Sequence, residues 1–298
     1  WPRARLALTL LFLASLLWSV SFALIGAMDI DPTLLTAARL GLAALVIAPF
    51  TLSPKAKGKP GPARAAQLAL IGALQYGLMY LLVHRAYGYL EGYQVALLTI
   101  TTPLYVVLVE GYVHRHPPAR AWGAAALAVA AAFVLRMESA QGLAGEEDYW
   151  VGVGLVQAAN LAWASGLVLY RRLESPSTAT PRRFGWMLIG GFLLALPVAV
   201  ATVEPSELQL TARELGGIAY LGLVPSGLAF FLWNRGATQV SVGTLAVMNN
   251  LKVPLAVTVA LMPPFSEPAA PWPLATSFAL LGAALILGTR GAGRREGD

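Results

Sequence analysis

The chain contains no cysteine among its 298 residues. Disulfide frameworks, thiolate metal sites and thiol nucleophiles are therefore excluded. Charge is also scarce, because Asp, Glu, Lys and Arg make up only 12% of the residues. A soluble domain usually carries about twice that fraction of charged residues. With 57% hydrophobic residues, the chain has too few charges to cover a water-exposed surface, and we interpret lipid as its solvent.

Signatures of catalysis are missing as well. The three histidines, His84, His114 and His116, lack the spacing and the acidic partners of a metal site. The sequence has no P-loop, no dinucleotide-binding fingerprint and no nucleophile elbow. We therefore expect no metal, no cofactor, no enzymatic activity and no consumption of ATP by this chain.

The formal net charge of +6 does not indicate nucleic-acid binding. Basic residues sit between apolar runs and form no patch interleaved with aromatic side chains. The partners we expect are the lipid bilayer and a small molecule, and nothing in the sequence requires more than a monomer.

Ten apolar runs are long enough to cross a membrane, which takes about 20 residues of helix. Breakers such as Pro32, Pro117-Pro118 and Pro263-Pro264 separate them. The first run is too long for the apolar part of a signal peptide, so we interpret it as a retained helix. The predicted spans are 6–26, 33–52, 65–84, 93–113, 119–136, 150–170, 184–203, 214–234, 240–262 and 271–289.

The placement of charge supports an even number of spans. If the N-terminus is inside, the basic loop at 53–64 and the arginine pairs at 171–172 and 182–183 fall on the cytoplasmic side. The acidic loop at 137–149 then falls outside. This distribution follows the positive-inside rule, and it predicts an inner-membrane protein with both termini in the cytoplasm.

The two halves of the sequence resemble each other. Trp18 in the first span matches Trp163 in the sixth, and Pro103 in the fourth matches Pro254 in the ninth. Five spans in each half is an odd number, so the copies would enter the membrane from opposite sides. The pattern predicts an all-α polytopic membrane protein with ten transmembrane helices as two inverted five-helix repeats, at 1–140 and 145–298. The alternative is chance similarity between apolar helices.

Several short stretches carry a resemblance to a known family. The most specific runs from Tyr220 to Asn234; the others are Trp18-Ser19, Pro32, Thr36 through Arg39, Thr102-Pro103, Pro254 and Glu267-Pro268. In these residues the chain resembles the EamA family of the drug/metabolite transporter superfamily, and in particular its aromatic amino acid exporters. The resemblance implies export of amino acids, metabolites or drugs. One departure is Arg115-His116, where members often have an acidic residue.

Lys252 is the strongest candidate for a substrate-binding residue. It lies near the middle of the ninth span, where a lysine costs about 2.5–3.5 kcal/mol on insertion scales and normally faces a cavity or a partner. A substrate carboxylate would be such a partner, and Asn249 lies one turn away on the same face. The alternative is a structural ion pair or a neutral, buried lysine. Nearby, Pro254 removes a backbone donor and loosens the helix.

Aromatic and polar side chains form two further groups of candidates. Trp18, Tyr80, Tyr105 and Trp163 lie deeper in their spans than the aromatic belts at the membrane surfaces. We expect at least two of them to line a cavity and to stack on a substrate. Thr101 and Asn160 are polar groups inside the spans. Their alternative role is hydrogen bonding between helices.

Two charged residues remain open in their roles. Glu110, near the inner end of the fourth span, is a candidate for proton coupling, with extension to the cytoplasmic surface as the alternative. For Arg39, in the second span, we expect packing against an outside loop.

The sequence thus predicts alternating access around a cavity lined by the spans 6–26, 65–84, 93–113, 150–170, 214–234 and 240–262. Pro103 and Pro254 would allow their helices to bend as gates. The predicted substrates are amino acids, with aromatic or large apolar side chains favoured, and related metabolites. The alternatives are drugs, nucleotide sugars or organic phosphates, or a membrane scaffold or enzyme.

Overall fold

A computed structural model of the chain describes residues 2–26, 28, 30–53, 58–90, 92–114, 119–134, 147–260, 262 and 271–289. Glu267 and Pro268, which contribute to the family resemblance, lie outside these residues, as do Arg115 and His116, which depart from the family pattern. Most of the acidic loop at 137–149 also lies outside them. Within the described ranges every regular element is helical and none is a strand. The all-α prediction is therefore confirmed for this part of the chain.

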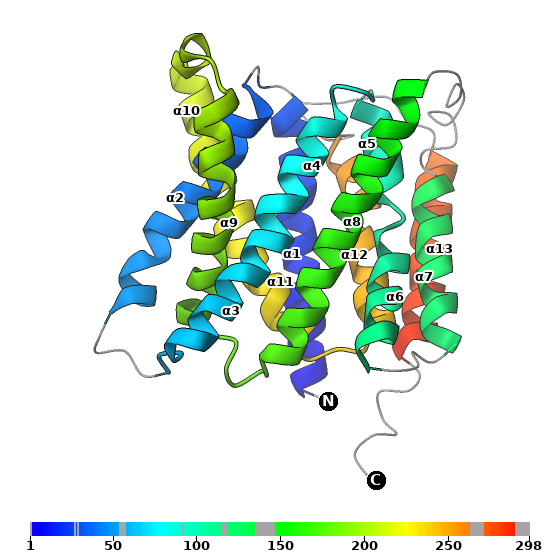
Figure 1. The fold of residues 1–298 in the computed structure, drawn as a ribbon. Coiled ribbons are helices and arrows are strands. Elements are labelled where there is room, and N and C mark those ends of the chain that lie inside the picture. Colours follow the sequence, from blue (N-terminus) through cyan, green and yellow to red (C-terminus); the bar gives the residue numbers. More distant parts are fainter. Residues whose placement is uncertain are drawn as a thin grey trace.

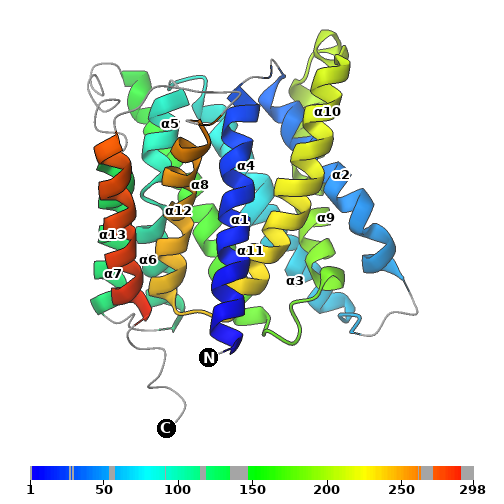
Figure 2. The same ribbon diagram turned by 180° about the vertical axis from the view of Figure 1, so that it is seen from behind.

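The helices stand side by side in one bundle (Figures 1 and 2). Among the residues that the structure describes, seven helical stretches are long and apolar enough to cross a membrane, and three further apolar stretches are shorter. The elements are α1 (Pro2–Gly26), α2 (Pro32–Leu52), α3 (Pro62–Gly72), η1 (Ala73–Leu78), α4 (Met79–Ala86), α5 (Gly92–Thr99), α6 (Thr102–His114), α7 (Ala119–Val134), α8 (Glu147–Leu173), α9 (Pro181–Thr202), η3 (Pro205–Leu208), α10 (Ala212–Leu221), η4 (Gly222–Ala229), α11 (Phe230–Ala237), α12 (Val242–Ala260) and α13 (Pro271–Thr289).

Three predicted spans contain irregularities that the apolar pattern does not show. The run predicted as one helix over 93–113 is two helices, α5 and α6, with a break at Ile100-Thr101. The third and eighth predicted spans are continuous over 62–86 and 212–237, but each contains a π-helical segment, η1 or η4. Such segments are rare and are frequently found at functional sites.

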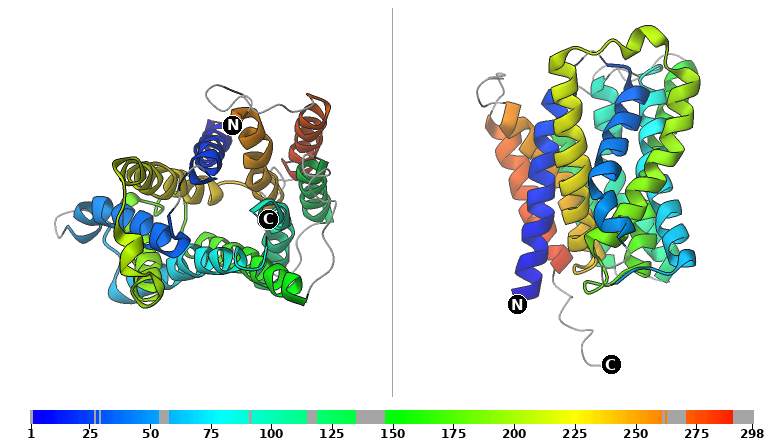
Figure 3. Two further views of the ribbon diagram at one scale, coloured as in Figure 1. Left: turned by 90° about the horizontal axis from the view of Figure 1, so that it is seen from above. Right: turned by 90° about the vertical axis from the view of Figure 1, so that its left-hand side faces the viewer.

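Each half of the chain packs against the other. Helix α1 lies against α11 and α12 from the second half, whereas α8 lies against α4 and α6 from the first. Helices α2 and α9 also lie side by side, and they run in opposite directions through the bundle (Figure 1). Helix α1 begins on the same side of the bundle as α13 ends. Seen from above, the helices surround a central region (Figure 3).

Helices α3 and α9 approach closely because two glycines meet the facing backbone. A Cβ placed on Gly72 would collide with the backbone of Met187, and one on Gly190 would collide with the backbone of Ala69. Small residues at a helix interface allow this approach in membrane proteins, where packing replaces the hydrophobic drive for association.

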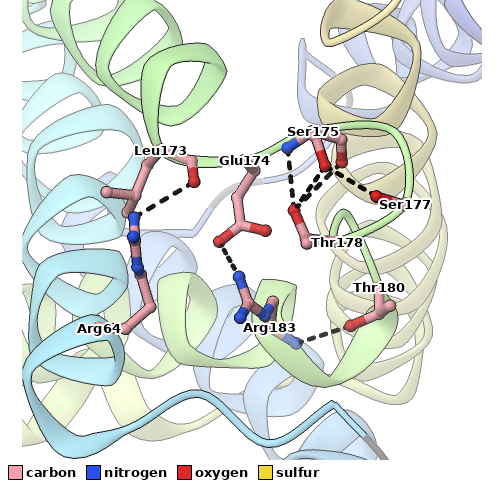
Figure 4. Close-up of polar contacts among 8 residues, drawn as sticks. All are labelled: Arg64, Leu173, Glu174, Ser175, Ser177, Thr178, Thr180 and Arg183. Carbon is pink, nitrogen blue, oxygen red and sulfur yellow. Dashed lines mark hydrogen bonds and ion pairs between the residues drawn. The ribbon is translucent and has the colours of Figure 1, made fainter.

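The connection between α8 and α9 is fixed by polar contacts (Figure 4). Arg64 donates to the carbonyl of Leu173 at the end of α8, at 3.2 Å. The buried carboxylate of Glu174 pairs with Arg183 at 2.6 Å. Thr180 caps α9 by accepting from the backbone N–H of Arg183. These contacts join α3, α8 and α9 at one end of the bundle.

Candidate functional site

A cavity with a volume of about 160 Å³ opens inside the bundle. Helices α1, α2, α4, α5, α6, α8, α11 and α12 contribute to it, so the second predicted span joins the six that we expected. The lining residues are Trp18, Ser21, Ile25, Arg39, Met79, Tyr80, Val83, Thr99, Thr102, Ala159, Asn160, Trp163, Phe230 and Lys252.

Aromatic rings form one side of the cavity. Trp18 contacts Trp163, with ring centroids 5.8 Å apart, and Phe230, at 5.4 Å. Phe230 also contacts Trp163 at 5.8 Å and Tyr80 at 6.4 Å. Rings at these separations stabilise each other beyond the area they bury. We call these four residues the aromatic wall; they present flat, weakly polar surfaces to a ligand.

Two cations face the same cavity. The Nζ of Lys252 lies 6.0 Å from the centroid of the Trp18 ring. The Cζ of Arg39 lies 4.8 Å from the centroid of the Tyr80 ring. No Asp or Glu is among the residues that line the cavity. Across the described ranges, neither cation pairs with a carboxylate. A ligand that brings negative charge would therefore meet two uncompensated cations in a largely apolar site.

The break between α5 and α6 forms a polar edge of the cavity. Pro103 has no N–H to donate to the carbonyl of Thr99, and the Thr102 hydroxyl lies 2.5 Å from that oxygen instead. Asn160 on α8 donates to the carbonyl of Leu98 at 3.0 Å. Its amide oxygen lies 2.9 Å from the Thr102 hydroxyl. Side chains thus satisfy backbone groups that a continuous helix would have paired.

Helix α12 supports the same break from its other side. Asn250 is fully buried and donates to the carbonyl of Ile100 at 2.8 Å and to that of Ala128 at 3.0 Å. Broken helices whose freed backbone groups are satisfied inside the protein are a recurring feature of transporter sites.

The structure brings five of the predicted binding residues to one cavity: Lys252, Trp18, Tyr80, Asn160 and Trp163. Three others lie outside its lining. Thr101 bonds to Gln157 at 2.9 Å and accepts from Asn160 at 3.1 Å. Tyr105 packs against the main hydrophobic cluster. Asn249 is fully buried, and its amide has no hydrogen-bond partner in the described ranges.

The two charged residues with open roles have definite surroundings. Glu110 pairs with Arg171 on α8 at 2.9 Å and lies outside the cavity lining. Arg39 is 3% exposed and lines the cavity. The expectation that Arg39 packs against an outside loop is therefore wrong, because its side chain turns inward to Tyr80 on α4 and Ser226 on η4. Pro103 lies at the α5–α6 break, and Pro254 lies inside the continuous helix α12.

Sequence reasoning missed several residues of the site. Phe230 and Thr102 line the cavity. Ser226 lies outside the lining, and its hydroxyl accepts a hydrogen bond from Arg39. A charged residue inside a span usually faces a cavity, and this signal alone could have placed Arg39. Nothing in the local pattern singles out Phe230 from the other phenylalanines.

Comparison with known proteins gives consistent relatives. The pattern of the EamA-like transporter family matches the chain twice, over residues 5–137 and 150–288. A biotin transporter of Salmonella typhimurium is 36% identical, with 94% of this chain and 90% of that protein covered. A biotin transporter of Escherichia coli is 35% identical over 85% of this chain and 83% of that protein. A probable biotin transporter of Pseudomonas aeruginosa is 36% identical, with 85% and 87% covered.

One solved structure, described as a crystal structure of a protein, has the same fold. It superposes with a TM-score of 0.78 over 97% of this chain and 98% of that chain, at 21% identity. The resemblance to the EamA family is confirmed by the family pattern and the relatives, and the closer resemblance to its aromatic amino acid exporters stays a prediction. These relatives are transporters and not enzymes. This chain belongs to the EamA-like transporter family of the drug/metabolite transporter superfamily, and it is a multi-pass membrane protein.

Proposed function

We propose that this protein carries a small amphipathic carboxylate across the membrane by alternating access, with biotin as the first candidate substrate. The observation that carries the proposal is the pair of cations, Arg39 and Lys252, in a cavity lined otherwise by aromatic and neutral side chains. Biotin has one carboxylate on an alkyl chain and a compact bicyclic urea. The names of the relatives point to the same substrate.

The chemistry of the cavity discriminates among the substrate classes expected from the sequence. A free amino acid is a zwitterion, and its ammonium group would need a carboxylate or several acceptors. The described cavity lining offers no Asp or Glu for that ammonium, and the same argument disfavours cationic drugs. A monoanion with an apolar body fits better than either, so amino acids become the second candidate.

We assign roles to the residues as follows. Lys252 supplies positive charge to the substrate carboxylate, and the aromatic wall contacts the apolar body of the substrate. Asn160 and Thr102 present polar atoms at the helix break, where Pro103 allows α5 and α6 to move independently. Pro254 gives α12 a matching point of flexibility. Three predicted binding residues lie outside the cavity lining. They would support the residues of the lining, or bind substrate in another conformation: Thr101, Tyr105 and Asn249.

The proposed architecture is ten spans in two inverted halves, residues 1–140 and 145–298, in the inner membrane with both termini in the cytoplasm. The family pattern occurs once in each half. The π-helical segments η1 and η4 occupy corresponding places in the two halves, as do the neighbouring, oppositely directed helices α2 and α9. Inverted halves place the substrate between them near the middle of the membrane.

The test is counterflow of labelled biotin in proteoliposomes. We expect the wild-type protein to exchange biotin, and Lys252→Met to lower the exchange at least tenfold, because the side chain keeps its length but loses its charge. Lys59→Met is the matched control, since Lys59 is exposed and remote from the cavity lining. Exchange of an unlabelled amino acid in place of biotin would favour the second candidate. Unchanged exchange by Lys252→Met would remove Lys252 from the site.

A further inference from the structure

Arg39 is held in a fixed orientation by residues far away in the chain. Its Nε donates to the hydroxyl of Ser226 at 2.8 Å, and its guanidinium lies over the ring of Tyr80 at 4.8 Å. Ser226 is fully buried, and Arg39 is 3% exposed. Since the Ser226 bond uses only Nε, the two terminal amino groups of the guanidinium remain as donors.

The segment that holds Arg39 also holds the aromatic wall. Ser226 belongs to the π-helical segment η4, and the preceding residue, Pro225, accepts from the indole Nε1 of Trp18 at 3.2 Å. Of these two adjacent residues of η4, Ser226 binds Arg39 directly. Pro225 binds Trp18, the ring beside Lys252. This gives the π-helical geometry of η4 a role in arranging the cavity.

The two cations lie at different parts of the wall. Lys252 is near Trp18 and Arg39 is near Tyr80, and each of these rings contacts Phe230, at 5.4 and 6.4 Å. A single carboxylate bound by Lys252 beside Trp18 would leave the terminal amino groups of Arg39, beside Tyr80, without an acceptor. N–H donors without an acceptor are costly in a largely apolar site, so a second acceptor on the substrate would be favoured.

We propose that Arg39 is a second substrate anchor, which recognises a neutral hydrogen-bond acceptor remote from the carboxylate, such as the carbonyl oxygen of a cyclic urea or amide. Ser226 is its positioning residue. This inference rests on the proposed function, because it assumes that Lys252 binds the carboxylate. It adds a rule of specificity: the site selects carboxylates that carry an acceptor at their other end.

The experiment compares three ligands with purified protein in nanodiscs, by measuring equilibrium binding. Biotin has both the carboxylate and the urea, 5-phenylpentanoate has the carboxylate alone, and biotin methyl ester has the urea alone. We expect wild-type protein to bind biotin at least tenfold more tightly than phenylpentanoate. Arg39→Met should lower the affinity for biotin at least tenfold and leave the affinity for phenylpentanoate unchanged. Lys252→Met should lower the affinity for both acids and leave the affinity for the methyl ester unchanged.

Ser226→Ala tests the positioning role without altering the cation. We expect the affinity for biotin to fall several-fold while the affinity for phenylpentanoate stays the same. Ser226→Thr, which keeps the hydroxyl, should restore the affinity for biotin. Arg64→Met is the control for loss of an arginine, because Arg64 lies outside the cavity lining and contacts the end of α8. The affinity for phenylpentanoate reports on folding in the Arg39, Ser226 and Arg64 variants, and the affinity for biotin methyl ester does so in Lys252→Met. Ser226→Ala carries the test if Arg39→Met does not fold.

The outcomes separate the two proposals. If Arg39→Met weakens biotin and phenylpentanoate equally, or leaves both unchanged, the second anchor is wrong while biotin remains the substrate. If wild-type protein binds neither acid, the proposed function fails and the second anchor fails with it.

Discussion

Arg171 on α8 and Glu110 on α6 form an ion pair of 2.9 Å beside the connection between α11 and α12. Arg171 also donates to the carbonyls of Ala237 and Val240, each at 2.9 Å. One guanidinium therefore links α6, α8 and the connection that leads into α12. Because its partners come from both halves of the chain, this contact joins the two halves at one end of the bundle.

Glu110→Gln should lower the thermal stability of the protein. The change leaves the mostly buried Arg171 without its counter-ion, and we expect a loss of about 2–3 kcal/mol, near the lower limit for breaking a buried pair. Binding affinity for substrate should stay within twofold, because Glu110 lies outside the cavity lining. The measurement is a melting curve in detergent together with equilibrium binding. A variant of normal stability that no longer responds to a pH gradient would instead assign Glu110 the coupling role expected from the sequence.

Gly72→Ala should destabilise the contact between α3 and α9. The added methyl group would meet the backbone of Met187, which cannot rotate away, and overpacking of this kind costs about 1–3 kcal/mol. Gly154→Ala is the matched control, since a Cβ there meets nothing within 4 Å. We expect the control to be as stable as the wild type or more so, because alanine favours helix. Equal melting temperatures for the two variants would contradict the close packing of these helices.

Trp18→Phe should weaken substrate binding by several-fold while preserving an aromatic ring in the wall. The change removes the indole donor and leaves the carbonyl of Pro225 without this bond, at a cost of about 1 kcal/mol. Trp272→Phe serves as the control, because Trp272 is 59% exposed on α13. Binding titrations distinguish the two, and an unaffected Trp18→Phe would show that η4 does not position the wall.

Asn160→Ala should impair transport by loosening the break between α5 and α6. The change removes the donor to the carbonyl of Leu98 and the partner of Thr102. We expect the free energy of unfolding to fall by about 1–3 kcal/mol. Ser277→Ala provides the contrast, because the buried Ser277 hydroxyl has no partner within the described ranges, and its removal should cost nothing. Exchange rates and melting curves measure both variants. Wild-type exchange by Asn160→Ala would separate the break from the transport mechanism.

The orientation in the membrane can be tested by single cysteines, since these 298 residues contain none to give background. If the N-terminus is cytoplasmic, Ser206→Cys in the connection after α9 should react with an impermeant maleimide in intact cells. Lys59→Cys, before α3, should react only after the membrane is opened. Both positions are exposed in the structure. The reverse pattern of labelling would invert the topology.

Much of the fold could be predicted because a membrane span is specified by the residues of one continuous segment. Apart from the break inside 93–113, the predicted spans fall on helical residues in the described ranges, since about 20 consecutive apolar residues suffice to specify a span. The break at Ile100-Thr101 was less predictable. Pro103 signals a weak point, but only the capping by Asn160 and Asn250 from other helices makes the break stable.

The sequence by itself determined that the chain is helical and apolar enough to span a membrane and which family it belongs to, and it predicts a polar environment for Lys252 inside the membrane. Only the tertiary structure decided that Arg39 lines the same cavity as Lys252, because Ser226, which binds Arg39, lies 187 residues further along the chain. Helices that are apolar on nearly every face do not reveal which face turns inward. That rotation is set by packing between distant segments, as where Trp18 meets Pro225, and it determines which polar groups share the cavity.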